Sequence, residues 1–141
     1  MMTLIPPEEV AVEDAADIVR ARSAARQISA QIGFGLADQT RLVTAVSELT
    51  RNVVQYAGRG RCRICDASDE ITMTVSIVVE DYGPGIADID KAMANGYSTG
   101  GGLGAGLPGT QRLMDGFAIE SAPGLTRVVI EMKRKRTVGV R

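Results

Sequence analysis

The spacing of apolar residues predicts two amphipathic helices in the first part of the chain. The first runs from Asp14, which is placed to cap it, to about Ile32. Its apolar positions follow helical spacing at Ile18, Ala21, Ala25, Ile28 and Ile32. A second helix is expected from about Asp38 to Ala57, before Gly58 and Gly60. Its apolar stripe has steps of four, three, four and three residues, at Leu42, Val46, Leu49, Val53 and Tyr56.

Runs of β-branched and apolar residues predict strands around these helices. A short strand is expected at residues 10–12, a hairpin at 61–67 and 71–81, and a second hairpin at 117–121 and 126–132. Short helices are expected at residues 88–94 and from the glycine-rich stretch to about Met114. This order predicts a two-layer α/β (α+β) sandwich, in which helices cover one face of a mixed, mostly antiparallel sheet.

Length and charge narrow the class of protein. A chain of 141 residues suits a single domain, 1–141, and its basic end at 133–141 (KRKRTVGVR) is expected to fray past the last strand. The net charge of −1 argues against general nucleic-acid binding. No secretory signal opens the sequence, and its longest apolar run, 71–79, is too short to span a bilayer. We therefore expect a cytoplasmic location.

The sequence contains no histidine, which excludes histidine-based acid–base chemistry, Ser–His nucleophiles and the commonest zinc ligands. Chemistry must use carboxylates, amides, backbone groups or a hard metal ion. The two cysteines, Cys62 and Cys65, lack the two further ligands of a zinc site. Residues three apart in a strand face opposite sides, so we interpret this pair as incidental thiols.

Glu48 and Asn52 lie four residues apart on the second predicted helix and therefore share one face, one turn apart. An amide oxygen is a suitable Mg²⁺ ligand, and a neighbouring carboxylate can orient or deprotonate an attacking hydroxyl. Taken alone, this spacing is also common on solvated helix faces.

Asp81 ends the strongest predicted strand, within E-D-Y-G-P-G-I. A carboxylate buried there needs a hydrogen-bond donor, which the amino group of adenine could supply. Gly83 and Gly85 allow the close approach of a flat ring and a positive φ. The alternative is a simple turn at the end of a strand.

A glycine-rich segment, 100–106, precedes the last predicted helix. Backbone N–H groups of glycines can surround anionic oxygens, and a helix N-terminus adds its dipole. The segment lacks the Lys-Ser/Thr of a P-loop and the preceding strand of a dinucleotide fingerprint. The alternative is a flexible surface loop. In that case the conformational entropy lost by so many glycines on folding would not be offset by any binding contact.

Three motifs together resemble the N-box, G1 box and G2 box of the GHKL ATPases: E-L-T-R-N (48–52), D-Y-G-P-G (81–85) and G-G-L-G-A-G-L (101–107). Longer stretches, including Y-A-G-R-G and G-Y-S-T-G-G-G-L-G-A-G-L-P-G-T-Q-R-L-M-D, are similar to the anti-sigma-factor-type serine kinases of bacterial stress-signalling (stressosome) pathways. The resemblance spans residues 10–133. It implies a Bergerat ATP-binding fold with ATP and Mg²⁺ as cofactors.

The resemblance also implies roles for individual residues. Glu48 would be the catalytic base toward a protein serine, and Asn52 would hold Mg²⁺ through the ATP phosphates. Asp81 would bind the adenine amino group, and Thr126 would close the adenine pocket through this Asp and a water. The other nucleotide-binding residues would be Gly83, Gly85, Ile86, Gly101, Gly102, Leu103, Gly104, Ala105, Gly106 and Leu107.

The partners implied by the resemblance are proteins. The kinase would phosphorylate a STAS-domain antagonist and, when released, bind and activate a PP2C-type phosphatase. No nucleic-acid or membrane partner is expected, and a homodimer is left open. Two alternatives remain: an anti-sigma factor of the same fold that binds a sigma factor directly, and a nucleotide-binding regulator without kinase activity. A histidine kinase or gyrase-like ATPase domain is disfavoured by the missing histidine and the short chain.

Overall fold

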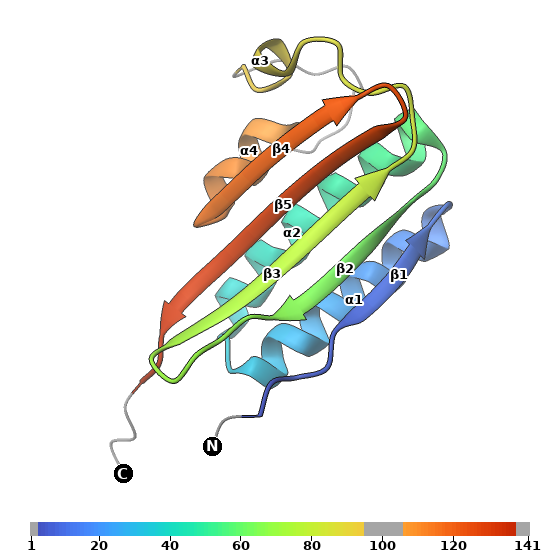
Figure 1. Cartoon of the computed structure of the whole chain (residues 1–141). Coiled ribbons are helices and arrows are strands. Elements are labelled where there is room, and N and C mark those ends of the chain that lie inside the picture. Colours follow the sequence, from blue (N-terminus) through green and yellow to red (C-terminus); the bar gives the residue numbers. More distant parts are fainter. Residues whose placement is uncertain (1–2, 95–105, 138–141) are drawn as a thin grey trace.

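The structure is a computed structural model of the chain, and it describes residues 3–94 and 106–137. Two helices and a five-stranded sheet form its body (Figure 1). The elements in chain order are β1 (Glu8–Val12), α1 (Ala15–Ile32), α2 (Leu36–Asn52), the π-helix η1 (Val53–Ala57), β2 (Gly60–Asp66), β3 (Thr72–Asp81), α3 (Ile89–Ala92), α4 (Gly106–Leu113), β4 (Gly116–Ala122) and β5 (Leu125–Lys135).

The strands form one sheet in the order β1-β2-β3-β5-β4. All four strand pairings in the described part of the chain are antiparallel, whereas a mixed sheet was expected. Both predicted hairpins are present, as β2–β3 and β4–β5. Helices α1, α2 and α4 cover one face of the sheet (Figure 1), which confirms the predicted two-layer α/β sandwich.

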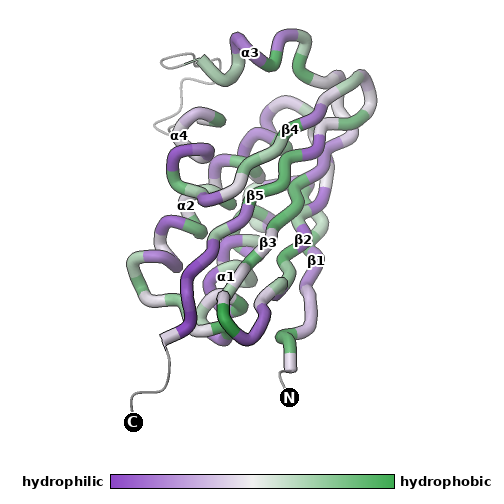
Figure 2. Tube along the Cα trace, turned by 60° about the vertical axis from the view of Figure 1, so that its left-hand side comes forward, coloured by the Kyte–Doolittle hydropathy of each residue, from purple (hydrophilic) through white to green (hydrophobic). Residues whose placement is uncertain are grey.

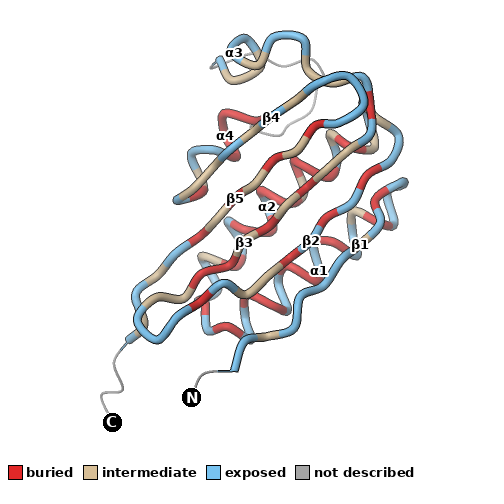
Figure 3. The backbone as a smooth tube through the Cα atoms, in the orientation of Figure 1, coloured by how far each residue is buried: buried red, intermediate tan, exposed pale blue. Residues whose placement is uncertain are grey.

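The core lies between the sheet and the two long helices. Ile64, Ile77 and Ile130 are register partners on β2, β3 and β5, so their side chains form one fully buried row. Leu42 and Val46 of α2 belong to the same core cluster and are also fully buried. Figure 2 shows hydrophobic residues along the central strands, and Figure 3 shows that their buried positions alternate with more exposed ones.

The first helix agrees with its sequence pattern. The Asp14 carboxylate accepts a hydrogen bond from the backbone N–H of Asp17 at 3.0 Å, so Asp14 is the predicted N-cap. The apolar positions from Ala21 onward are buried, while Ile18 is only partly buried. The helix ends at Gly33, as expected.

The end of the second helix differs from the prediction. The α-helix stops at Asn52, and Val53–Ala57 continues as a π-helix that closes with the Gly58 N–H donating to the Val53 carbonyl at 2.8 Å. A π-helical turn contains more residues than an α-helical turn, so the positions after Val53 are rotated. Tyr56, predicted to continue the buried stripe, is therefore 46% exposed.

The prediction that residues 133–141 fray is wrong for residues 133–135, because β5 continues to Lys135. The Arg134 guanidinium donates to both carboxylate oxygens of Asp38 at 2.9 Å and to Asp115 at 2.9 Å. The backbone N–H of Arg136 donates to the Ile71 carbonyl at 2.8 Å. Side-chain and backbone bonds therefore hold this end of the strand, while residues 138–141 lie outside the described part of the chain.

Replacing Arg134 by alanine is expected to lower the free energy of unfolding by about 1 kcal/mol at pH 7, because a bidentate ion pair is lost. Arg134 also lowers the pKa of Asp38 below its ordinary value. At pH values above the pKa that Asp38 has in the unfolded chain, its lowered pKa stabilises the folded state. This contribution is lost as the pH falls through the pKa that Asp38 has in the folded chain. Urea unfolding should therefore show a difference between Arg134→Ala and wild type that shrinks below about pH 4. Lys135→Ala, at the exposed position next to Arg134, is the control. Equal losses of unfolding free energy in the two variants would contradict the role of the ion pair.

The two cysteines are both free and lie on opposite sides of β2, as expected. Cys62 is fully buried, and burial raises the pKa of its thiol to about 12, so it stays protonated at neutral pH. Within the described ranges, no cluster of three His, Cys, Asp or Glu residues could hold a metal ion. None of the helices in the same ranges is long and apolar enough to cross a membrane.

Candidate functional site

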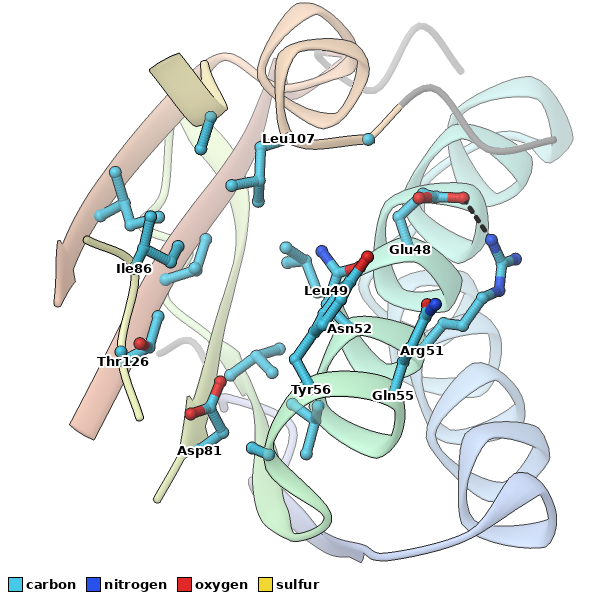
Figure 4. Close-up of a pocket in the computed structure, with 18 of the residues that line it drawn as sticks. Glu48, Leu49, Arg51, Asn52, Gln55, Tyr56, Asp81, Ile86, Leu107 and Thr126 are labelled. Carbon is cyan, nitrogen blue, oxygen red and sulfur yellow. Dashed lines mark hydrogen bonds and ion pairs between the residues drawn. The ribbon is translucent and has the colours of Figure 1, made fainter. Parts of the chain in front are cut away.

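A pocket of about 570 Å³ opens between the end of α2 and the adjoining end of the sheet. Helix η1, the start of α4 and the segment after β3 complete its walls (Figure 4). The pocket gathers these residues that the sequence predicted for the site: Glu48, Asn52, Asp81, Gly85, Ile86, Gly106, Leu107 and Thr126. The predicted residues Gly101, Gly102, Leu103, Gly104 and Ala105 lie outside the described residues.

The helical wall carries Glu48 and Asn52, one turn apart on α2 as their spacing predicted (Figure 4). Glu48 is only 7% exposed, and its Oε1 accepts a hydrogen bond from Nη1 of Arg51 at 2.7 Å. Arg51 was not among the predicted site residues, although opposite charges three residues apart on a helix are a recognisable signal in the sequence. Arg51 gives the buried carboxylate a charged partner and restricts its orientation.

The opposite wall comes from the ends of β3 and β5. Asp81 and Thr126 are register partners on these strands, so their side chains lie on the same face of the sheet. Oδ1 of Asp81 accepts the backbone N–H of Gly83 at 3.0 Å. Burial raises the pKa of Asp81 above its ordinary value, and the Gly83 hydrogen bond opposes this change. The pocket therefore contains a partly buried hydrogen-bond acceptor beside a buried hydroxyl group.

Ser121 is a further polar residue at this wall that the sequence analysis missed. It lies opposite Thr126 in the β4–β5 register, and the two hydroxyl oxygens are 2.6 Å apart. Its Oγ also accepts the backbone N–H of Ile86, which lines the pocket, at 2.7 Å. Ser121 therefore connects the strand wall to the segment that follows β3.

The two glycines after Asp81 serve different contacts. Gly85 has a φ of +87°, and a Cβ there would lie 2.7 Å from the Ala122 carbonyl oxygen. Gly83 does not line the pocket; a Cβ on Gly83 would lie 2.6 Å from the Cβ of Ala57. The close neighbour of Gly83 is thus helix η1, whereas the close approach of a flat ring was predicted there.

Replacing Gly83 by alanine is expected to lower the free energy of unfolding by about 1–3 kcal/mol, because Ala57 or the turn must shift. Thermal unfolding should show a fall in Tm of several degrees, on the order of 5 °C. Gly35→Ala is the comparison for an added methyl group that meets no atom within 4 Å; because Gly35 is the N-cap of α2, we expect this variant to lose less than about 1 kcal/mol. If both variants keep the wild-type Tm, the contact between η1 and the turn is not tight.

The two ends of the pocket differ in chemistry. Its middle is apolar, with Leu49, Val53, Val79, Ile86, Leu107, Ile119 and Val128 in the lining. Asp81 supplies one acceptor beside this apolar region, which fits a flat ring that carries an N–H group. Asn52 and the N-terminus of α4 supply hydrogen-bond donors at the other end, which fit an anionic group, and the Glu48 carboxylate also lines this end. Without a carboxylate cluster among the described residues, a metal ion there would need ligands from the bound anion.

The chain matches the histidine kinase-like ATPase domain over residues 11–132 and therefore belongs to this GHKL-type family. ATP use follows from the ATPase domain. Among curated proteins, the chain is 51% identical over 108 residues to the serine/threonine-protein kinase RsbT of Bacillus subtilis. This alignment covers 77% of the chain and 81% of RsbT, and it supports protein-serine/threonine kinase activity.

Solved structures agree on the fold. The RsbU and RsbW domains of Rv1364c from Mycobacterium tuberculosis superpose with a TM-score of 0.68 and 19% identity. That match covers 95% of this chain and 34% of the other, so this chain spans about a third of the length of that solved chain. The mycobacterial sensor histidine kinase MprB gives a TM-score of 0.51 at 15% identity, over 94% of this chain and 99% of its own. At these identities the matches show the fold alone.

Proposed function

We propose that the chain is an ATP-dependent protein-serine kinase of a bacterial partner-switching stress-response pathway. Its substrate would be a STAS-domain antagonist protein, and the released kinase would bind and activate a PP2C-type phosphatase. The observation that carries the proposal is a buried carboxylate, Glu48, at the polar end of a pocket whose other end is suited to a nucleobase. The 51% identity to RsbT supports the kinase class, and the motif resemblance suggests the partners.

In this proposal the nucleobase occupies the apolar part of the pocket. Asp81 accepts a hydrogen bond from the amino group of adenine, and Thr126 closes the pocket beside it through a water. Ile86 packs against the ring, while Gly83 and Gly85 shape the turn that brings Ile86 into the lining. The apolar lining near Asp81 supports this assignment, because a flat ring buries well there and leaves one acceptor to satisfy.

The phosphates would lie toward Asn52 and the start of α4. The Asn52 amide oxygen would hold Mg²⁺ through the ATP phosphates, and Gly106 and Leu107 would present backbone N–H groups at the helix N-terminus. The preceding glycine-rich residues, 101–105, would add further backbone donors. Mg²⁺ bound with ATP would offset the charge that develops on the transferred phosphoryl group.

Glu48 would act on the incoming serine. Its carboxylate would orient the hydroxyl and accept its proton while the serine oxygen bonds to the γ-phosphorus and the bond from that phosphorus to the bridging oxygen of ADP breaks. Arg51 would keep one carboxylate oxygen in place through the 2.7 Å hydrogen bond, which leaves the other oxygen for the serine. Binding of ATP needs no such carboxylate, so Glu48 favours a kinase over a regulator that only binds nucleotide.

Phosphate transfer to a purified STAS-domain protein tests this function. ATP labelled at the γ-phosphate should label serine on that protein, and Glu48→Ala and Asn52→Ala should abolish the labelling. Normal labelling by both variants would show that the site assignment is wrong. ATP binding without any transfer would favour the regulator, and capture of a sigma factor in place of the STAS protein would favour the anti-sigma factor.

A further inference from the structure

Two residues of the pocket lining, Asp81 and Thr126, form one row with Ser121 across three neighbouring strands. Asp81 of β3 is the register partner of Thr126 on β5, and Thr126 is the register partner of Ser121 on β4. Partners in antiparallel strands point to the same side of the sheet, so the three side chains lie next to one another. Thr126, in the middle of the row, is 7% exposed.

Short hydrogen bonds connect this row to the segment after β3. The hydroxyls of Ser121 and Thr126 are 2.6 Å apart, and either atom could be the donor. The backbone N–H of Ile86 donates to Ser121 Oγ at 2.7 Å. Ser121 Oγ therefore already accepts one hydrogen bond, from a group whose donor role is fixed.

The direction of the bond between the two hydroxyls decides what Thr126 can offer the pocket. If Thr126 donates, Ser121 accepts two hydrogen bonds and its own proton needs a third partner. The pocket then receives only Thr126 lone pairs, next to the Asp81 carboxylate. If Ser121 donates, it makes one hydrogen bond as donor to Thr126 and one as acceptor from Ile86. The hydroxyl proton of Thr126 is then not used by Ser121 and stays available on the side of Thr126 where Asp81 lies. A carboxylate repels lone pairs that face it, so the first arrangement is unfavourable beside Asp81 and the second is favoured.

We propose that Ser121 is a positioning residue for nucleotide selection: it donates to Thr126, so that Thr126 is a hydrogen-bond donor toward the pocket. The pocket wall then presents an acceptor, Asp81, beside a donor, Thr126. This pair complements an amino group next to an unprotonated ring nitrogen, as on the pairing edge of adenine. The proposal rests on the proposed ATP site, because it assigns a partner to a base bound there.

The same serine would also hold one side of the base pocket. Ile86 lines the pocket, and its N–H is bonded to Ser121. A variant without the Ser121 hydroxyl would therefore lose two effects: the fixed direction of the Thr126 proton and the anchor of the Ile86 backbone. The first effect changes which base edge is preferred, whereas the second weakens every base equally. This difference makes the two roles separable by experiment.

The two roles of Ser121 can be separated by measuring how tightly the full chain binds three triphosphates. ATP is compared with 1-deaza-ATP, which lacks the ring nitrogen that would accept from Thr126 or from the water held by Thr126. It is also compared with purine riboside triphosphate, which lacks the amino group that would face Asp81. Wild type should bind each analogue about tenfold more weakly than ATP, the usual effect of one hydrogen bond. Ser121→Ala should bind ATP and 1-deaza-ATP within about twofold of each other, yet keep its preference over purine riboside triphosphate.

Two further variants complete the design. Ser121→Cys fills a similar space with a weak donor, so its preference over 1-deaza-ATP should also fall, and it replaces the alanine variant if that protein does not fold. Ser76→Ala, on the opposite face of β3 from Asp81, is the matched control and should behave as wild type.

The outcomes separate the inference from the function on which it rests. A Ser121 variant that keeps the wild-type ratio between ATP and 1-deaza-ATP overturns the inference. A variant that weakens all three ligands equally does the same, because Ser121 would then act only as an anchor for Ile86. Wild-type protein that binds none of the three triphosphates overturns the ATP site itself, and the inference with it.

Discussion

Replacing Glu48 by glutamine is expected to slow phosphorylation of the partner serine by about 10²–10⁴-fold, while the affinity for ATP stays within about twofold. Glutamine keeps the size of the side chain and an oxygen that can accept from Arg51. It cannot take the proton of the serine hydroxyl. The large effect follows because loss of general-base catalysis acts on the transfer step, whereas the nucleotide contacts lie elsewhere in the pocket.

Single-turnover transfer from labelled ATP measures the first quantity, and titration calorimetry with ATP measures the second. Glu120→Gln is the matched control, since Glu120 is largely exposed on β4 and does not line the pocket. Full transfer by Glu48→Gln would mean that another group accepts the proton. A parallel loss of ATP affinity would mean that Glu48 binds nucleotide in place of acting on the serine.

Replacing Asp81 by asparagine is expected to weaken ATP binding by about 10- to 100-fold, the usual loss when a charged acceptor is removed from a buried hydrogen bond. The same change should make the ATP-free protein slightly more stable near neutral pH. Burial raises the pKa of Asp81, which means that the folded chain disfavours the ionised carboxylate. The raised pKa of Asp81 lowers the stability of the folded state as the pH rises, first through the pKa of this carboxyl in the unfolded chain and then through its pKa in the folded chain. Asparagine removes this loss because it does not ionise. Its amide oxygen can still accept from Gly83.

Calorimetry with ATP and thermal unfolding without ATP measure these opposite effects. In wild type, affinity for ATP should also fall as pH is lowered through the raised Asp81 pKa, because a protonated carboxyl is a weaker acceptor. The variant should lack this part of the pH dependence. Asp90→Asn, at an exposed position of α3 outside the pocket lining, is the control. Unchanged ATP affinity in Asp81→Asn would exclude Asp81 from base recognition.

The helices and hairpins could be predicted because their signals are local. Asp14 caps α1 through a bond to Asp17, three residues away, and the stripe from Leu42 to Val53 has the period of one helix. The π-helix η1 had no such signal. Its five residues are compatible with an α-helix. In the structure, the last of them, Ala57, packs closely on Gly83, which lies 26 residues later in the sequence. Tyr56 was therefore placed on the wrong face.

The site was predictable to a different degree on each wall. Glu48 and Asn52 share a helix, so their spacing alone placed them together. Asp81 and Thr126 meet only through the pairing of β3 with β5. Ser121 could have been found from the short turn at Pro123 and Gly124, because pairing of Ala122 with Leu125 sets Ser121 opposite Thr126. No comparable signal indicated Arg134, which reaches Asp38 across 96 residues.

The sequence by itself determined the types of the main elements, the helical face with Glu48 and Asn52, and the motifs that indicate a GHKL-type ATPase. Each of these depends on residues within one or two turns or one strand of each other. Only the tertiary structure decided the pairing of Asp81 with Thr126, the packing of Gly83 against Ala57 and the extension of β5 to Lys135. Those contacts join distant segments, and strand register and side-chain packing select them after the chain has folded.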